Sequence, residues 1–346
     1  MTSRFPLVLV AALVAVPVHA GQDKETARVK SSVKVRQAWA ARYQDTRHGP
    51  EVTERFNRTA RIGRTGAFEL SNIAGDVTVT GGSGDDVRIE AVKRTRSRDE
   101  SNAKTLLDDL RIEVTELPNR VEVRTVYPRN RRNYSASVDY TIALPSGASA
   151  NVRSVSGSVR VTNVKGELRA ESISGSVVTT GATRLALVKS VSGDIDITDA
   201  AAEGQVNAST VSGHLVARGL TAGSLDLSSV SGDILLTNVT AERVAVKTVS
   251  GNLEYAGPLA RNGRYEMNAH SGNVRLAVSR TSGFELEATT FSGDVRSEFP
   301  LTLHAGVQSE GRRRSQLNRS IRGSFGDASA IVNLKSFSGD IVVTKR

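Results

Sequence analysis

The sequence has 346 residues, a formal net charge of +10 and no cysteine. The lack of cysteine excludes disulfides, thiol catalysis and cysteine-ligated metal sites. Aromatic residues make up only 4% of the chain, whereas it has 30 glycines, a composition that favours short β-branched strands and tight turns over packed helices.

The first twenty residues have the layout of a secretory signal peptide. Arg4 supplies a positive charge, residues 7–16 form an uninterrupted apolar run, and Val18-His19-Ala20 offers small residues for cleavage. The run is too short to span a bilayer comfortably, and no later segment is apolar enough to do so. We therefore expect cleavage after Ala20 and export to the periplasm or the cell surface.

The next part of the chain divides into a leader and a repeat domain. Residues 21–65 are charged and irregular, which indicates a leader or tether. From residue 66 apolar and polar residues alternate with the period of a strand, so we expect a domain over 66–346. One short helix is predicted over 102–110, where Leu106, Leu107 and Leu110 have helical spacing and Ser101 or Asn102 can cap its start.

A Ser-Gly turn recurs through the second half of the sequence. Successive glycines lie 18 to 21 residues apart, until a gap of 46 residues precedes the last one. A period of about 19–20 residues fits one solenoid coil of two short strands and two turns. The predicted fold is therefore all-β, a β-solenoid of the parallel β-helix type. The glycines are Gly157, Gly175, Gly193, Gly213, Gly232, Gly251, Gly272, Gly293 and Gly339, with Gly75 as a degenerate earlier copy.

Three residue types at this turn have separate expected roles. Glycine supplies a positive φ or lets neighbouring coils approach closely. Serine is expected to bond the amides of its own turn. Aspartate follows five of these glycines, including Gly193 and Gly232, and we expect it to bond turn amides. Calcium binding by a file of these carboxylates is the alternative.

The 46-residue gap before Gly339 indicates two coils with an inserted loop. The loop, residues 306–323, is the most basic short stretch after the leader. Its arginines are candidates for contact with a polyanion, and the alternative is a solvated loop without a ligand. The candidates are Arg312, Arg313, Arg314, Arg319 and Arg322.

These motifs resemble a bacterial β-strand-repeat family known as putative adhesins, which carries a toastrack-type domain of unknown function. The resemblance covers roughly residues 56–346 and rests on Gly75-Asp-Val-Thr-Val79, Leu106-Leu-Asp-Asp-Leu110 and the Ser-Gly-Asp-Ile turns. It implies an envelope-associated, non-enzymatic module that is often linked to cell-envelope stress. Many members are attached to membrane-spanning segments, and this sequence has none after its signal. The resemblance therefore does not imply direct membrane signalling for this chain.

No constellation for catalysis converges in the sequence. His214 and His270 lie at turns three repeats apart, about 14 Å at the spacing of neighbouring coils, which is too far for a shared metal. We expect no catalytic residue, no metal site and no cofactor. A polysaccharide lyase or hydrolase stays the enzymatic alternative, because parallel β-helices host such sites.

The function expected from these observations is a non-catalytic binding or scaffolding surface in the cell envelope. The net charge favours anionic envelope polymers or lipid headgroups as partners, and the low aromatic content disfavours specific nucleic-acid recognition. The alternative is a protein partner, including self-association through the end coils, whose strand edges are open unless capped.

Overall fold

Short strands with alternating burial make up most of the molecule. In residues 221–231, for example, Leu225 and Leu227 are buried and Asp226 between them is exposed. The computed structural model describes residues 50–97, 99–127, 135–279, 283–303 and 319–346. The predicted signal peptide and residues 21–49 of the predicted leader lie outside these ranges.

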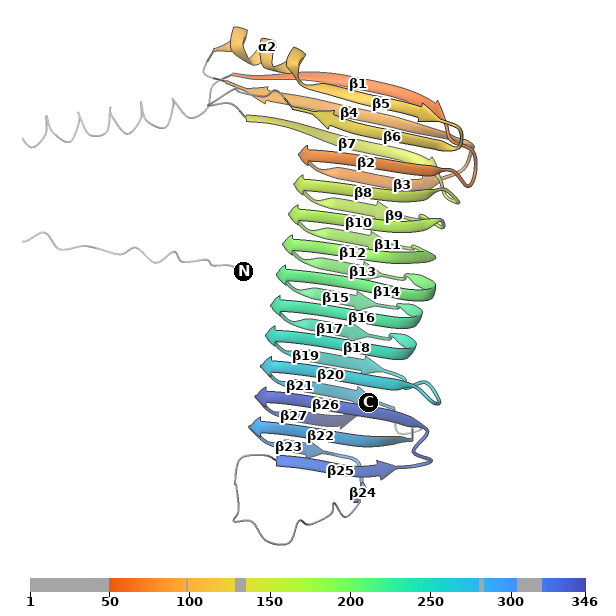
Figure 1. Cartoon of the computed structure of the whole chain (residues 1–346), viewed down its shortest axis with the longest axis vertical. Coiled ribbons are helices and arrows are strands. Elements are labelled where there is room, and N and C mark those ends of the chain that lie inside the picture. Colours follow the sequence, from red (N-terminus) through yellow and green to blue (C-terminus); the bar gives the residue numbers. More distant parts are fainter. Residues whose placement is uncertain (1–49, 98, 128–134, 280–282, 304–318) are drawn as a thin grey trace, which may run out of the picture. The chain divides into compact units, whose positions relative to one another are not determined.

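The strands form two sheets that run side by side along the solenoid (Figure 1). Sheet A contains, in spatial order, β1 (Glu51–Arg61), β4 (Asp86–Arg96), β7 (Ser135–Pro145), β3 (Val77–Gly82), β9 (Val159–Thr162), β11 (Val177–Thr180), β13 (Ile195–Thr198), β15 (Leu215–Arg218), β17 (Ile234–Thr237), β19 (Leu253–Gly257), β21 (Val274–Val278), β27 (Ile341–Lys345) and β23 (Val295–Ser297). Sheet B contains β24 (Thr302–Leu303), β25 (Arg319–Phe325), β22 (Phe284–Ser292), β26 (Ala330–Ser338), β20 (Arg264–Ser271), β18 (Thr240–Ser250), β16 (Thr221–Ser231), β14 (Ala201–Ser212), β12 (Arg184–Ser192), β10 (Glu167–Ser174), β8 (Ser149–Ser156), β2 (Ala67–Ala74), β6 (Arg120–Val126) and β5 (Arg111–Leu117).

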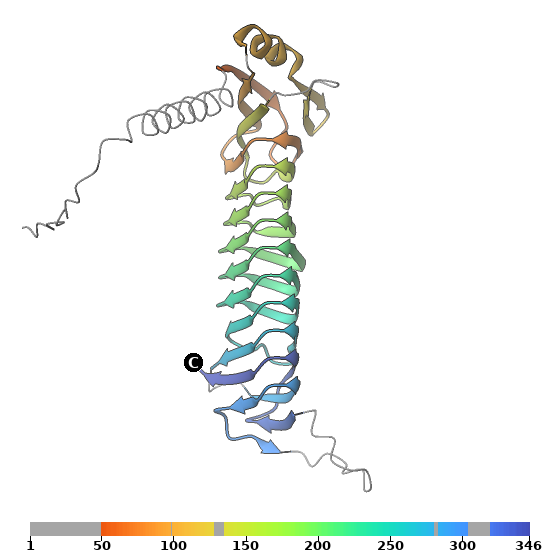
Figure 2. The same cartoon turned by 90° about the vertical axis from the view of Figure 1, so that its left-hand side faces the viewer.

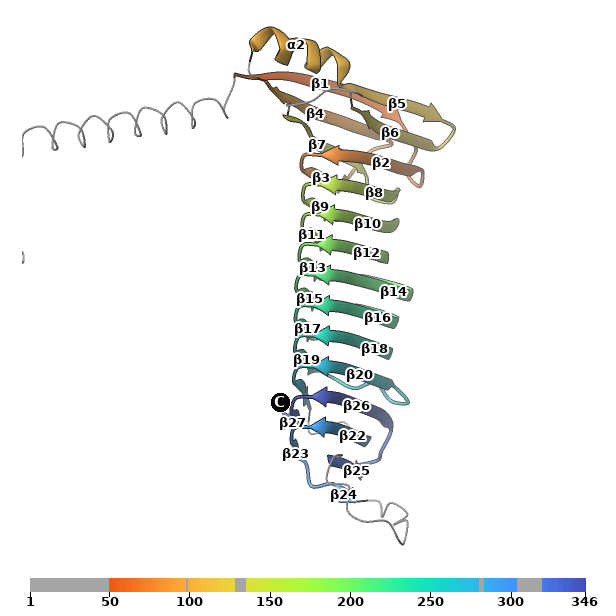
Figure 3. The same ribbon diagram turned by 60° about the vertical axis from the view of Figure 1, so that its left-hand side comes forward.

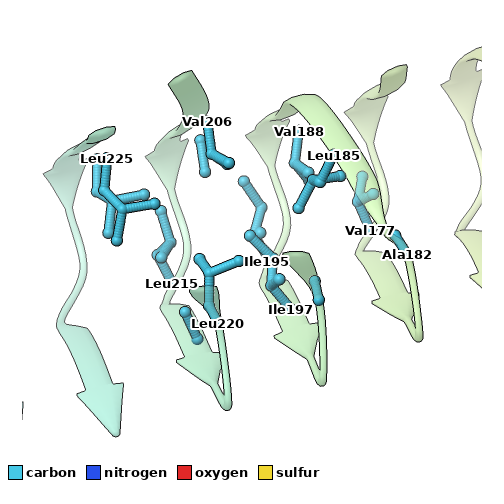
Figure 4. Packing of buried hydrophobic residues seen from close by; sticks show 14 of the residues in the cluster. Val177, Ala182, Leu185, Val188, Ile195, Ile197, Val206, Leu215, Leu220 and Leu225 are labelled. Carbon is cyan, nitrogen blue, oxygen red and sulfur yellow. The ribbon is translucent and has the colours of Figure 1, made fainter. Parts of the chain in front are cut away.

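Each coil contributes one strand to each sheet, and the Ser-Gly turn joins the two (Figure 2). Neighbouring coils pair in parallel and in register, as where Val177, Ile195 and Leu215 follow one another across β11, β13 and β15. The inward side chains stack between the sheets (Figure 4). Burying one such Val, Leu or Ile stabilises the fold by about 1.5–3 kcal/mol, and each coil repeats this contribution. The predicted all-β solenoid is confirmed.

Antiparallel strands and the helix cover the N-terminal end of the solenoid. β1 pairs with β4, β4 pairs with β7, and β5 pairs with β6, all antiparallel. Residues 51–61 were placed in the leader by the sequence, yet they form β1, because an edge strand needs no repeat motif to pair. The coil β2–β3 lies between β6–β7 and β8–β9, so chain order and spatial order differ at this end.

The predicted helix is α2, Glu100–Asp109, which contacts β1 and β4. Ala103, Leu106 and Leu107 are its buried residues. Its N-cap is Asp99 rather than the expected Ser101 or Asn102, and no side chain bonds the free amides there. Among the described residues, none of the helical segments has the length and apolar character needed to cross a membrane.

The C-terminal end corrects the expectation of sequential stacking. The 46-residue gap does not hold two coils in order. Instead β24 and β25 make antiparallel pairs beyond β22, and the last coil, β26–β27, returns to lie between β20–β21 and β22–β23 (Figure 3). Insertion gives both strands of this last coil a parallel neighbour on each side, so its backbone groups are paired in the interior rather than left at an edge.

Candidate binding face

Glycine at the Ser-Gly turn lets the coils touch. Gly232 has a φ of +148°, and a Cβ built on it would lie 2.0 Å from the carbonyl oxygen of Gly213 in the preceding coil. Both expected reasons for glycine, positive φ and close backbone approach, are therefore present at this turn. The same contact recurs from coil to coil, so the turn is a continuous backbone spine.

The hydroxyl that serves this spine is not the serine next to glycine. In seven coils a buried hydroxyl three places before the glycine donates to the glycine carbonyl of the neighbouring coil, as Ser190 Oγ does to Gly175 O at 3.0 Å and Thr290 Oγ1 does to Gly339 O at 2.9 Å. The serine adjacent to glycine, such as Ser192, is exposed. The expected bond from the turn serine to the amides of its own turn is therefore wrong: the bonding hydroxyl stands two places earlier, and it donates to a carbonyl of the neighbouring coil.

The residue after glycine bonds the next coil, as expected for aspartate. Asp194 Oδ1 accepts from the amide of His214 at 2.8 Å, and Asp233 Oδ1 accepts from the amide of Asn252 at 2.7 Å. His214 Nδ1 takes the same place and accepts from the amide of Asp233 at 3.3 Å. In the described part of the chain, no three His, Asp or Glu side chains gather closely enough to hold a metal ion.

An exposed row of ten side chains, nine of them apolar and the tenth His270, follows the spine on the outer face of sheet B. Each member stands two places before a turn glycine, and its exposure is high for an apolar residue, as with Val191 at 46% and Phe337 at 49%. We call this row the apolar stripe. Its members, in spatial order, are Ile73, Val155, Ile173, Val191, Val211, Val230, Val249, His270, Phe337 and Phe291. Nine spacings of about 4.8 Å make it about 43 Å long.

Aromatic rings extend the stripe at its C-terminal end. Phe337 lies between His270 and Phe291, at centroid distances of 4.9 Å and 4.8 Å and with nearly parallel planes. Because the rings stack on one another, Phe337 has both faces covered and presents its edge to solvent. This arrangement continues the apolar stripe and does not offer the open ring face on which a sugar would stack.

A groove of about 650 Å³ runs beside the N-terminal half of the stripe. The stripe is one wall. Residues four places before each glycine, together with Arg124 of β6, form the other, and buried residues such as Ser172 and Thr210 line its floor. Side chains two places apart on a strand point to the same face of a sheet, which is why two such rows enclose a groove.

The second wall, extended along sheet B, carries five basic residues and one acidic residue among uncharged polar ones, and we call it the basic wall. Arg124, Lys189, Lys247 and Lys335 are exposed and have no ion pair with any residue that the structure describes. Glu171, the acid in this row, pairs with its neighbour Arg153 at 3.2 Å. The residues that follow the turn glycines lie on the other side of the stripe, and five of these ten are aspartates. The stripe therefore separates a row with surplus positive charge from a row whose acidic members are aspartates.

The basic loop predicted as a polyanion contact is only partly within the described residues. Arg312, Arg313 and Arg314 lie outside them. Arg319 is at the start of β25 and pairs with Asp294, and Arg322 pairs with Glu285 at 3.3 Å. The charges of these two arginines are therefore compensated locally. The predicted polyanion site stays a prediction.

The positive surplus of the protein does not belong to the described solenoid. Its described residues contain 30 Lys and Arg and 32 Asp and Glu, whereas the whole sequence contains 46 and 36. Many of the described basic groups pair across strands, as Arg218 does with Asp196 at 3.2 Å. One continuous basic face over the solenoid was an alternative that the sequence allowed. The described body is near neutral and its charges are scattered, so it does not have such a face.

The sequence analysis missed the apolar stripe, although a signal for it was present. Buried residues of the coil around Gly232 stand at Leu225, Leu227 and Ser229, and Val230 has the opposite parity. In nearly every coil an apolar residue recurs at a position whose side chain points outward, so this residue belongs to a repeated surface pattern and not to the core.

Comparison with known proteins adds a family match. The family model described as Toastrack DUF4097 matches residues 67–344. None of the curated proteins matches the sequence. The resemblance stated from the motifs is therefore confirmed at the level of the family.

Ten chains of solved structures match this chain, and the following three are among them. A putative adhesin from Bacteroides fragilis is 13% identical, with a TM-score of 0.41, and the match covers 84% of this chain and 97% of that one. A putative adhesin from Parabacteroides distasonis is 12% identical, with a TM-score of 0.40 and coverage of 85% and 97%. A putative lipid binding protein from Parabacteroides distasonis is 11% identical, with a TM-score of 0.35 and the same coverage.

Proposed function

Since the chain belongs to the Toastrack DUF4097 family, we propose that it is an exported, non-catalytic interaction scaffold whose contact face is the apolar stripe. The observation that carries this proposal is a row of apolar side chains about 43 Å long, left exposed along one face of a regular solenoid. Scattered apolar residues on a surface need no explanation, but a contiguous row of this length marks a contact site.

Export is supported by the N-terminal twenty residues, whose sequence has the charged, apolar and small-residue segments of a signal peptide. In an oxidising compartment a cysteine-free chain gains nothing from disulfides. Its stability then depends on coil stacking, and the solenoid supplies that through its continuous core. The cell envelope is the compartment that these features fit best.

Contact with anionic envelope polymers is a second proposed activity, assigned to segments outside the described body. The body is close to neutral, so the positive surplus resides in the remaining segments, including Arg312, Arg313 and Arg314. Arg319 and Arg322 contribute less, because each already faces a carboxylate. Lipid headgroups or polysaccharides would be held there by long-range attraction that weakens with salt.

The test of the contact face is thiol accessibility in the producing cell. The protein has no cysteine, so a single V191C substitution gives one reactive thiol on the stripe. I331C is the matched control: Ile331 is an apolar residue of sheet B with 39% exposure, six residues along β26 from the stripe. A maleimide reagent should label both thiols in the purified unfolded protein.

In the intact envelope we expect the thiol of V191C to be protected at least several-fold relative to that of I331C. Protection means that a partner covers the stripe in the native compartment. Equal labelling of the two positions would sink the proposal that the stripe is a contact face. Labelling of neither would be resolved by opening the envelope, after which I331C should react and V191C should not.

A further inference from the structure

We infer that the partner on the apolar stripe is a second copy of this chain, related by a two-fold axis parallel to the solenoid. The inference rests on the proposed function, because it names the occupant of the same face. In such a dimer the two rods point in the same direction, and every coil faces its own equivalent. The same patch is then used by both copies, which closes the assembly at two.

The shape of the face suits this arrangement. The stripe is a ridge, and the groove lies directly beside it, toward the basic wall. A two-fold axis along the rod, placed between ridge and groove, sets the ridge of each copy into the groove of the other. Ile173, Val191 and Val211 would each fill space that the described solenoid leaves open. The ridge and groove are thus complementary to themselves.

The charges of the flanking rows select the direction of the two rods. A two-fold axis along the rod exchanges the two sides of the stripe, so the basic wall of one copy faces the turn residues of the other. In the coil of Gly193 this brings Lys189 opposite Asp194, and in the coil of Gly339 it brings Lys335 opposite Asp340. The bond to the next coil uses only Oδ1 of Asp194 and Asp340, so Oδ2 remains available for the partner's lysine.

No coil along the stripe would bring like charges together. Glu171 would face Ser176, Arg153 would face Ser158, and Lys247 would face Asn252. The opposite arrangement, with the rods antiparallel, keeps each row on its own side and places basic wall against basic wall. Like charges directly opposed across an interface cost free energy, so the antiparallel dimer is disfavoured.

The size of the face is adequate for a specific dimer. From the basic wall to the turn residues the strip spans six residues, which are five spacings or about 17 Å, and its length is about 43 Å. The product is about 700 Å² per copy, close to the ≈ 800 Å² that each partner buries in an ordinary specific interface. The described bodies are close to neutral, so the two solenoids themselves do not repel each other through net charge.

Cross-linking of single-cysteine variants tests the inference. Three variants each place one thiol on the stripe: V155C near one end, V211C in the middle and V249C further along. I331C is the control. Facing sheets lie about 10 Å apart, beyond the reach of a disulfide, so a short bismaleimide is the suitable probe. Each purified, mature variant is treated at micromolar concentration, and its folding is verified by its strand circular dichroism and melting temperature.

A parallel two-fold axis predicts that all three stripe variants form covalent dimers and that I331C does not. In an antiparallel dimer only the variant nearest the axis would link, because Val155 and Val249 lie five coils apart, about 24 Å. That pattern would overturn the inference, as would the absence of links at all three positions. If the links are absent while V191C stays protected in the envelope, another molecule covers the stripe and the proposed function survives.

Discussion

In seven coils a buried hydroxyl three places before the glycine joins two coils, whereas the serine next to the glycine points to solvent. Ser190 donates to the Gly175 carbonyl at 3.0 Å, and the hydroxyl of Ser192 is exposed and bonds no residue that the structure describes. Ala269 stands at this place in the coil of Gly272, and Ser154 in the coil of Gly157 makes no such bond, so the bond can be lost from single coils. The bond is therefore a stabilising increment repeated along the spine.

S190A should destabilise the solenoid by about 1 kcal/mol, the net worth of a buried hydrogen bond whose acceptor loses its donor. S192A should be neutral, because the exposed hydroxyl exchanges one set of water contacts for another. Urea unfolding followed by circular dichroism measures the difference between the two variants. Equal stability losses would mean that the turn serine carries the bond after all.

Substitution of a spine glycine should be more damaging. In G232A the new Cβ would meet the backbone carbonyl of Gly213 at 2.0 Å, and the residue would have to keep a φ of +148°. A strained backbone alone costs about 1–3 kcal/mol, and the collision adds to it. G204A is the control, since nothing lies within 4 Å of its added Cβ. Thermal melting should separate the two variants clearly, and a G232A protein as stable as G204A would contradict the tight spine.

Buried tyrosines give a pH dependence at the alkaline end: burial raises the pKa of Tyr140, and Tyr255 and Tyr265 form a second site. Burial is the main cause that raises the pKa of Tyr255 and Tyr265 above the usual value, and their hydroxyls donate to the Val239 and Ala241 carbonyls. The folded state thus holds these protons more tightly than the unfolded chain. The resulting stability is complete below about pH 10 and is lost as the pH rises beyond it toward the folded pKa values. Melting temperatures should be level up to about pH 9 and fall above pH 10, and the fall should shrink in Y255F/Y265F.

At the level of elements, each end of the solenoid contains a coil that lies between two coils that follow one another in the chain: β2–β3 at one end and β26–β27 at the other. β26–β27 separates β20–β21 from β22–β23, although it follows them in the chain. In a sequential solenoid, loss of the last coil removes one interface. Here the loss removes two and leaves β22 without its parallel neighbour.

A chain that ends at Ser329 should therefore lose more than its last coil. We expect β22, β23 and β25 to become sensitive to protease, while coils from β8 to β19 stay protected. Limited proteolysis with mass spectrometry locates the cleavage sites. Continued protection of β22 and β25 in the truncated chain would show that the inserted coil is not their main support.

Sequence could predict the coil but not the order of the coils. The period near twenty, the turn glycines and the alternation of buried residues such as Leu225 and Leu227 define one coil and its inward face. These features do not specify which coil packs against which, because every coil offers the same kind of strand edge for pairing. The place of β26–β27 depends on contacts between distant segments, and these leave no local pattern.

The candidate site was only partly within reach of the sequence for a related reason. The basic arginines were visible as a run, but the ion pairs of Arg319 with Asp294 and Arg322 with Glu285 depend on the antiparallel return of β25. The apolar stripe was visible by parity alone. Recognising it as a continuous surface requires the knowledge that all its strands belong to sheet B.

For the whole molecule, the described body is close to neutral and the remaining segments carry the positive surplus, and this distribution of charge predicts where polyanions bind. The triple variant R312S/R313S/R314S should reduce the affinity for an immobilised anionic polysaccharide at low salt several-fold and flatten its salt dependence. R319S/R322S should have a smaller effect, since those charges are compensated within the described body. Binding isotherms at two salt concentrations compare them, and equal losses in both variants would contradict the division.

The central claim is that the apolar stripe is left exposed in one chain because a second chain covers it. Light scattering of the purified mature protein tests this most directly. At micromolar concentration we predict twice the mass of one chain for the wild type and for I331D, and the mass of one chain for V191D/V211D, whose carboxylates would be buried in the contact. A wild-type protein that keeps the mass of one chain at every concentration would contradict the claim.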